Sequence, residues 1–240
     1  MAYATAGRVK IAASISLGVM LFCCALSPGQ QDDPKAVAPL APIAMPADRA
    51  AESYAIYSSL LPIGEIANAG WEHELWLVEE ATTTLASPDR PCSKLPGAGD
   101  SSWAAQFDPR TAAQPDAAHQ HDYAEILDDY FLNCHERIML DPEAWKTTAP
   151  VRLLDRQQQE EFRGSRATFH GKDEAVVAKY KRASALFAFS RVYFNAHHTV
   201  AMVFVSQWCG SLCGEDYWQA VELVDGRWKR LDWATTHGVS

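Results

Sequence analysis

The feature that most constrains the fold is the alternation of apolar runs and turn signals between residues 185 and 233. Strand-like segments at 185–194, 199–205, 217–224 and 227–233 are separated by a turn at 195–198, a loop at 209–216 and the dipeptide Asp225-Gly226. A two-residue Asp-Gly connection is typical of a type I′ hairpin turn. Strands that follow one another through short turns pair as an antiparallel meander. The sequence therefore predicts a C-terminal four-stranded antiparallel meander.

Helical patterns dominate the first half of the globular part. Apolar side chains recur at helical spacing, for example Tyr54, Tyr57 and Leu61, which stand at i, i+3 and i+7. We expect Asp48 to cap the first helix, Asp155 to cap a later one and Gly164 to end it. The helices are expected at residues 49–61, 116–134, 155–162 and 172–181. Helices before a meander imply an α+β class, with the helices covering one face of the sheet.

Two further strands and a loop complete the expected elements. Residues 74–85 are rich in Thr, Val and Trp, which favour strands, and residues 149–154 form a second short strand. Glu79 and Glu80 lie on the first of these strands, either as solvated acids or as a carboxylate site. Residues 86–118 lack periodicity and predict a surface loop, pinned by Cys92 and Trp103.

The N-terminus has the pattern of a secretion signal. Arg8 and Lys10 precede an apolar run at residues 11–25, which is shorter than the roughly 20 residues that a membrane span needs. Small residues favour cleavage after Ala25, giving a signal peptide at residues 1–25. Two alternatives stay open: lipidation of Cys23 or Cys24, or an uncleaved anchor. The chain is expected to be exported, as a periplasmic or extracellular protein or a lipoprotein.

The segment after the signal separates it from a single globular domain. Residues 26–48 are rich in Pro and Ala and predict an extended tether, followed by one α+β domain at residues 49–240. The whole chain has a net charge of −9, and loss of Arg8 and Lys10 with the signal makes it −11. An acidic protein repels nucleic acid and anionic lipid. We therefore expect no nucleic-acid partner, and membrane contact only through a lipid anchor.

Four cysteines remain after the signal, and an even count in an exported chain favours disulfides. Four cysteines allow three pairings, and local pairing of Cys209 with Cys213, which flank a short loop, is the simplest. A second bridge between Cys92 and Cys134 is expected to add more stability, but whether these two pair stays open. For Cys209 and Cys213, the alternative is a redox pair or half of a zinc site. A redox motif normally has two intervening residues at a helix N-terminus, whereas three residues separate this pair between strands.

Three short motifs stand out in the C-terminal stretch: Ser-Arg-Val-Tyr-Phe-Asn at residues 190–195, Cys-Gly-Ser-Leu-Cys-Gly at 209–214 and Gly-Arg-Trp at 226–228. They resemble a group of bacterial exported proteins of unknown function, which has a Ser-Arg-Val-Gly-Phe-Asn strand, a Cys-Gly-x-Leu-Cys-Gly loop and a final Gly-x-Trp hairpin. Asp129, Tyr130 and Asn133 are similar to upstream positions of the same group. Tyr193 stands where the pattern has Gly, which alters the local geometry if the glycine serves a close backbone approach. The resemblance implies a fold and no activity.

The central helix carries the candidate polar site. Asp129 and Asn133 share a helix face at i, i+4, next to Tyr130, as a binding patch, an acid–base group or a link to a neighbouring loop. His119 and His121, with Asp122 next to them, form a metal-like cluster in which the two histidines could be a zinc pair. No obvious further ligand completes the site. The sequence has no P-loop, dinucleotide fingerprint or HExxH motif, so no cofactor is expected.

Aromatic side chains crowd the meander. Trp208, Trp218 and Trp228 are candidates for an exposed aromatic surface that contacts a sugar, a peptide or another ligand, as exposed aromatic patches do. The expected function is a non-catalytic binding or structural envelope domain, with an unidentified envelope component or small ligand as partner. The alternative is a hydrolytic or metal-assisted enzyme that uses the carboxylates and histidines of the central helix.

Overall fold

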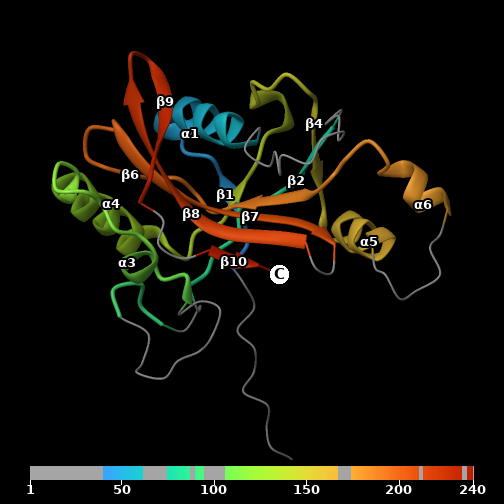
Figure 1. Cartoon of the computed structure of the whole chain (residues 1–240), viewed down its shortest axis with the longest axis horizontal. Helices are drawn as coiled ribbons and strands as arrows, with labels where there is room; N and C mark the ends of the chain where they lie inside the picture. The colour runs from blue at the N-terminus through green and yellow to red at the C-terminus, as the bar shows by residue number, and fades with distance from the viewer. Residues whose placement is uncertain are drawn as a thin grey trace, which may run out of the picture. The chain divides into compact units, whose positions relative to one another are not determined.

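A long antiparallel hairpin forms the centre of the sheet. The computed structural model describes residues 40–61, 75–86, 90–94, 106–166, 174–210, 213–233 and 237–239. Strand β7 (Val200–Gly210) pairs with β8 (Cys213–Val224) along almost its whole length, with Phe204 opposite Trp218 (Figure 1). The expected loop at 209–216 is shorter than predicted, because Cys209 and Gly210 belong to β7 and residues 213–216 belong to β8.

Each long strand carries two short strands on its outer side. β7 pairs with β5 (Leu186–Phe189) and β6 (Tyr193–Phe194), and β8 pairs with β9 (Arg227–Leu231) and β10 (His237–Val239). The expected strand at 185–194 is therefore interrupted at 190–192. Asp225 and Gly226 have φ values of 53° and 72°, as a type I′ turn requires.

Two parallel strands extend the sheet beyond the predicted meander. β2 (Trp76–Glu79) lies between β5 and β4 (Val151–Leu154) and is parallel to both. Within the described residues the sheet has eight strands, with a main order of β10-β8-β7-β5-β2-β4. A separate ribbon pairs β1 (Ile43–Ala44) with β3 (Ile138–Met139) in parallel. The α+β class is confirmed, and the sheet is mixed and mostly antiparallel.

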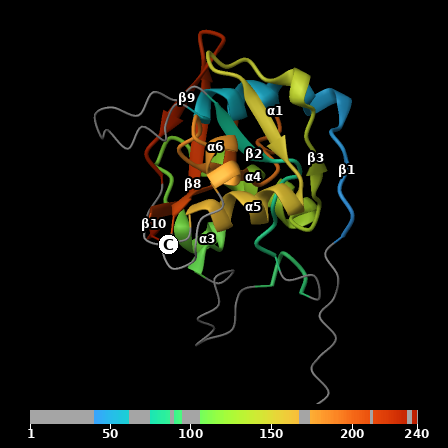
Figure 2. The same ribbon diagram turned by 90° about the vertical axis from the view of Figure 1, so that its right-hand side faces the viewer.

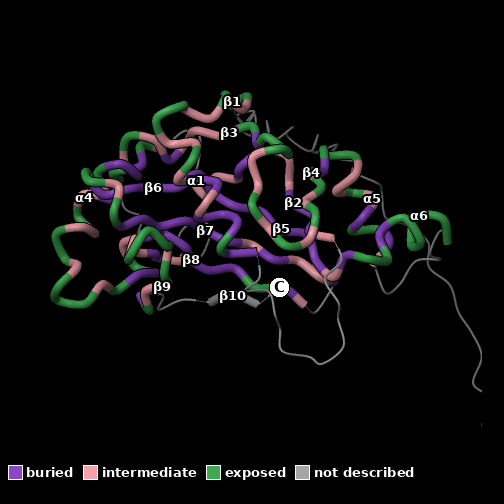
Figure 3. Tube along the Cα trace, turned by 90° about the horizontal axis from the view of Figure 1, so that it is seen from above, coloured by how far each residue is buried: buried purple, intermediate pink, exposed green. Residues whose placement is uncertain are grey.

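Helices cover both faces of the sheet, so the prediction of one covered face is wrong. α1 (Ala47–Leu60) packs on one face, against residues such as Val203 and Val205. The opposite face carries α3 (Pro109–Ala112), α4 (Gln120–Asn133), α5 (Arg156–Arg166) and α6 (Glu174–Lys179) (Figures 1 and 2). The physical reason lies in β7, where residues 200–205 are all buried (Figure 3). A continuous apolar strand needs a layer on each side.

Several boundaries differ from the predictions. α1 follows Pro46, so Asp48 lies in the first turn instead of capping it. The ribbon strand β1 and the start of α1 fall inside the expected tether. Gly164 lies within α5 and does not end it. Asp155 does cap α5, because the Asp155 Oδ1 accepts a hydrogen bond from the Gln158 N–H at 2.8 Å.

The expected surface loop at 86–118 contributes to the core. Phe107 and Ala112 are fully buried against α4 and β8. Further along the chain, the 3₁₀ turn η2 (Pro142–Ala144) connects β3 to β4. Trp103, the signal segment and most of the tether lie outside the described residues. Among the residues that are described, no helix has the length and apolar character needed to cross a bilayer.

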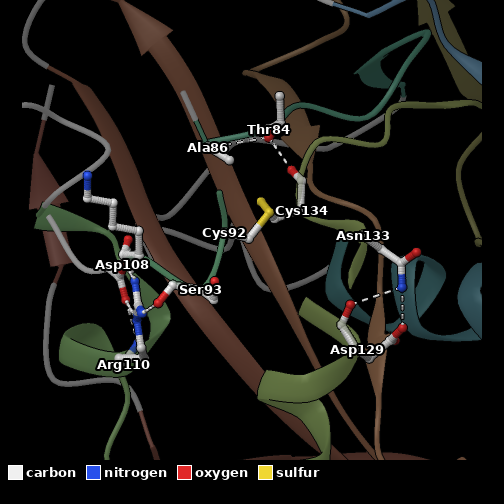
Figure 4. Close-up of a disulfide and its surroundings, with 10 residues drawn as sticks. Thr84, Ala86, Cys92, Ser93, Asp108, Arg110, Asp129, Asn133 and Cys134 are labelled. Atoms are coloured by element: carbon white, nitrogen blue, oxygen red, sulfur yellow. Dashed lines mark hydrogen bonds and ion pairs between the residues drawn. A yellow bond between two sulfur atoms is a disulfide. The ribbon is translucent and has the colours of Figure 1, made fainter. Parts of the chain in front are cut away.

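Cys92, Cys134, Cys209 and Cys213 form two disulfides. Cys92 joins Cys134 with their Cα atoms 6.1 Å apart, and this bridge connects the 90–94 segment to the end of α4 (Figure 4). Cys209 joins Cys213 across the end of the β7–β8 hairpin, with a Cα separation of 5.2 Å. The first bridge closes a 42-residue separation, so it removes more chain entropy from the unfolded state than the second.

Candidate functional site

Asp129, the centre of the predicted polar patch, is a buried link between three elements. Its Oδ2 accepts hydrogen bonds from Arg49 Nη1 on α1 at 2.6 Å and from the backbone N–H of Phe194 on β6 at 2.9 Å. Its Oδ1 accepts a hydrogen bond from Asn133 Nδ2 at 2.7 Å, as the i, i+4 spacing predicts (Figure 4). Both oxygens are therefore engaged inside the protein. The arrangement favours the linking role over an acid–base role.

The segment 190–195 uses its polar side chains in the same way. Ser190 Oγ accepts the Phe204 N–H at 2.9 Å and donates to the Arg191 carbonyl, which fixes the break between β5 and β6. Asn195 Oδ1 accepts the N–H groups of Thr199 and Val200, at 2.8 and 3.1 Å, which closes the turn into β7. We call residues 190–195, with Arg49, Asp129 and Asn133, the junction.

Charged and aromatic groups complete the junction. Arg191 is buried and pairs with Glu136. His198, in the turn that follows, lies 2.7 Å from Glu52 of α1 through its Nδ1 and stacks on Phe194. These contacts tie the turn to α1, so the residues that carry the resemblance have structural partners.

Tyr130 turns away from the patch and into the core. Its ring meets that of Tyr193 edge to face, with centroids 5.2 Å apart. Burial raises the pKa of Tyr130 to about 12 and that of Tyr193 well above its usual value. Tyr193, at the position where the pattern has Gly, thus fills space between α4 and the sheet. The predicted patch of Asp129, Tyr130 and Asn133 does not form a common exposed surface.

The histidines of the central helix have separate partners. His119 Nδ1 lies 2.8 Å from Asp116 Oδ1, and this hydrogen bond raises the pKa of His119. His121 is almost fully exposed beside Glu125, while Asp122 accepts a hydrogen bond from Asn195. In the described part of the chain, the one cluster of three potential ligand atoms is Cys92, Cys134 and His135, whose sulfurs form a disulfide. The structure does not bring the predicted metal-like group together.

The structure does not bring the three predicted tryptophans together on one exposed surface. Trp218 is 2% exposed, and its Nε1 donates to the Phe107 carbonyl at 2.7 Å. Trp208 packs against Phe162 on the same face of the sheet, and Trp228 packs against Phe194 on the other. Because strand side chains alternate between faces, the β8–β9 register places Trp228 opposite Leu223, away from Trp218.

A polar groove at the carboxyl ends of β2 and β4 is the strongest candidate site. It is a hollow of about 610 Å³ lined by the chain that follows β2, helix α5 and the β1–β3 ribbon. The ends of adjacent parallel strands meet at one edge of a sheet, which is where ligands bind in open α/β sheets. Helix α5 presents Arg156, Gln159, Glu160 and Arg163 to this groove from one face. We call this hollow the groove.

A partly screened charge cluster forms the wall of the groove. Arg163 Nη2 donates to Glu79 Oε1 at 2.9 Å, and the Glu79 side chain is 17% exposed. Burial raises the pKa of Glu79, while Arg163 and Arg137 oppose that rise. Two guanidinium groups therefore act on one carboxylate.

Arg137 is held by the backbone. Its Nε donates to the Thr82 carbonyl at 3.1 Å, and Thr82 is itself bonded to Ile138 through both its N–H and its Oγ1. Within the described residues, no carboxylate pairs with Arg137 and no basic side chain pairs with Glu80. At the rim, Arg156 and Glu160 form an exposed pair with an Nε–Oε1 distance of 3.2 Å, which contributes little to stability.

The sequence identified only part of the groove. Glu79 and Glu80 were visible as acids on a strand, whereas Arg137 and Arg163 gave no signal, because Arg163 meets Glu79 across 84 residues. Compared with known family models, curated proteins and solved structures, the chain shows no match to any of them. The choice of site therefore depends on its geometry and charge.

Proposed function

We propose that the protein is an exported, non-catalytic domain that binds a small polar ligand in the groove. The observation that carries this proposal is a hollow of about 610 Å³ in which Arg137 and Glu80 have no ion-pair partner among the described residues. Polar groups that converge on a concave surface are the usual mark of a small-molecule site.

Export is part of the proposal. The apolar run at 11–25, with Arg8 and Lys10 before it, supports a signal peptide with cleavage after Ala25, or lipidation of Cys23 or Cys24. Two disulfides support an oxidising destination, the periplasm or the extracellular space. The resemblance of residues 190–195, 209–214 and 226–228 to bacterial exported proteins agrees with this destination.

The contacts do not favour the enzymatic alternative. Asp129 uses both oxygens in hydrogen bonds to α1, α4 and β6, and His119 and His121 have separate acidic partners. A hydrolytic or metal-assisted site on the central helix would need these groups to meet around a substrate. A small ligand in the groove is also favoured over an envelope protein on an aromatic face, since Trp218 is buried.

The groove is tested by mapping where a natural ligand binds. The chain, isolated from the compartment to which it is exported, is mixed with a small-molecule extract of the source cells and followed by hydrogen exchange. We expect slower exchange at residues 79–84 and 156–163, and loss of this effect in Arg163→Ala. Arg227→Ala, an exposed change on β9, is the matched control. Protection confined to other elements, or none with any extract, would refute the groove.

Export is tested independently by fractionation and N-terminal sequencing. We expect the chain outside the cytoplasm, beginning at Leu26 or carrying lipid at Cys23 or Cys24. A cytosolic protein that retains Met1 would overturn the export proposal.

A further inference from the structure

We propose that the groove recognises a small ligand through an anionic group, a carboxylate or a phosphate, placed between Arg137 and Arg163. This inference rests on the proposed function, because it names the chemistry of the ligand in the same groove.

The pairing of charges at the screened wall leaves a guanidinium for an anion. Arg137 and Arg163 both act on the Glu79 carboxylate, Arg163 alone forms an ion pair with it, and Arg137 has no ion-pair partner among the described residues. The formal charges of the groove as a whole balance, because Glu80 and Glu160 also line it.

Hydrogen-bonding capacity points the same way. A guanidinium has five N–H donors, and its planar fork matches the oxygens of a carboxylate or phosphate. Arg163 uses Nη2 for Glu79, and Arg137 uses Nε for the Thr82 carbonyl. In the described structure their other nitrogens make no hydrogen bond, so each arginine retains donors for a ligand oxyanion.

The two arginines are held before a ligand arrives. The Thr82 carbonyl restrains Arg137, and Thr82 is locked to Ile138 by bonds of 2.9 and 2.7 Å. Arg163 is placed by α5 and held by Glu79. Such preorganisation lowers the entropy cost of binding. Glu79 is on this account a positioning residue that orients Arg163.

The test is calorimetric titration of the exported protein with three probes: succinate, inorganic phosphate and methylammonium. We expect one of the two anions to bind and methylammonium not to bind. Arg137→Ala and Arg163→Ala should each weaken the anion at least tenfold, because each removes a charge-assisted hydrogen-bond donor. Arg227→Ala, which removes an exposed guanidinium on β9 outside the groove, should change affinity by less than about twofold.

The outcomes separate this inference from the proposed function. Binding of succinate alone identifies a carboxylate, and binding of phosphate alone identifies a phosphate. If neither anion binds while the extract still protects 79–84 and 156–163, the anionic ligand is refuted and the groove stands. Binding of methylammonium that is lost in Glu80→Gln also refutes the anionic ligand.

Arg137→Lys keeps the positive charge and loses the planar guanidinium, so it should bind the anion with intermediate affinity. Circular dichroism checks that each variant is folded.

Discussion

The junction and the groove contain similar residues, arginines beside carboxylates, yet they use them differently. In the junction, Asp129 is buried and accepts hydrogen bonds from Arg49, Asn133 and the Phe194 N–H. In the groove, Glu79 pairs with Arg163 and Glu160 pairs with Arg156 at the rim, while Arg137 and Glu80 have no ion-pair partner among the described residues. Satisfied buried groups stabilise a fold, whereas unpartnered groups in a hollow are available to a ligand. The chemistry of a cluster therefore depends on which partners are missing.

The largest expected effect breaks the junction at its aromatic centre. Tyr193→Gly should lower the free energy of unfolding by about 5 kcal/mol, from loss of a buried ring and added backbone freedom. Urea denaturation measures it, with Tyr193→Phe as the control that retains the ring. A loss below about 1 kcal/mol would show that the ring does not support the junction.

The disulfide beside the junction comes next. Replacing Cys92 and Cys134 together by Ser should cost about 4 kcal/mol, and replacing Cys209 and Cys213 about 2 kcal/mol, because the larger loop restricts the unfolded chain more. Thermal and urea unfolding of the two double variants give the comparison. Equal losses would contradict the entropic explanation.

Asp129→Ala should lower the free energy of unfolding by about 3 kcal/mol, since it leaves Arg49 and a buried N–H without their partner. Its exposed neighbour supplies the control, and Asp128→Ala should change stability by less than about 0.5 kcal/mol. Neither variant should alter ligand binding in the groove. A weakened ligand in Asp129→Ala that is still folded would place the two regions in one site.

The smallest effect concerns the groove and its pH dependence. Burial holds the pKa of Glu79 above its ordinary value of 4.5, so the folded state binds this proton more tightly than the unfolded state. Stability due to Glu79 is thus lost as pH rises from about its ordinary pKa through its raised folded pKa.

Glu79→Gln should remove this part of the slope and change stability at neutral pH by under about 1 kcal/mol. Urea denaturation between pH 4 and 7 measures the difference between the two proteins. Burial also raises the pKa of Asp216, so the difference between variant and parent, and not the whole slope, is the test. Parallel curves would contradict the role of Glu79.

The sequence predicts those parts of the fold that local chemistry determines. Asp225-Gly226 specifies its turn because both residues adopt positive φ, and the Cys209–Cys213 bridge follows from the short spacing of its cysteines. The Cys92–Cys134 bridge joins residues 42 positions apart, and the structure shows it. The break at 190–192 could not be predicted from local sequence. It depends on the hydrogen bond that Ser190 Oγ accepts from the Phe204 N–H, and Phe204 lies on the neighbouring strand β7.

The candidate site was predicted less well than the fold. Asp129 and Asn133 form the expected pair, but burial beside Arg49 and Phe194 gives that pair a structural role. Arg137 and Arg163 come together with Glu79 through tertiary folding alone. For the fold, the sequence does contain one further signal: the apolar run at residues 200–205 is typical of a strand covered on both faces, and it indicates that helices pack on both sides of the sheet.

Each disulfide joins cysteines that are neighbours in the order Cys92, Cys134, Cys209 and Cys213. A chain that enters an oxidising compartment from its N-terminus can therefore close the first bridge before the third of these cysteines emerges. Thiol–disulfide exchange with an oxidant then forms the native bonds directly, and no wrongly paired bond has to be rearranged. Maturation should require an oxidant but no isomerase, and equal yields of native protein from cells with and without an isomerase would bear this out.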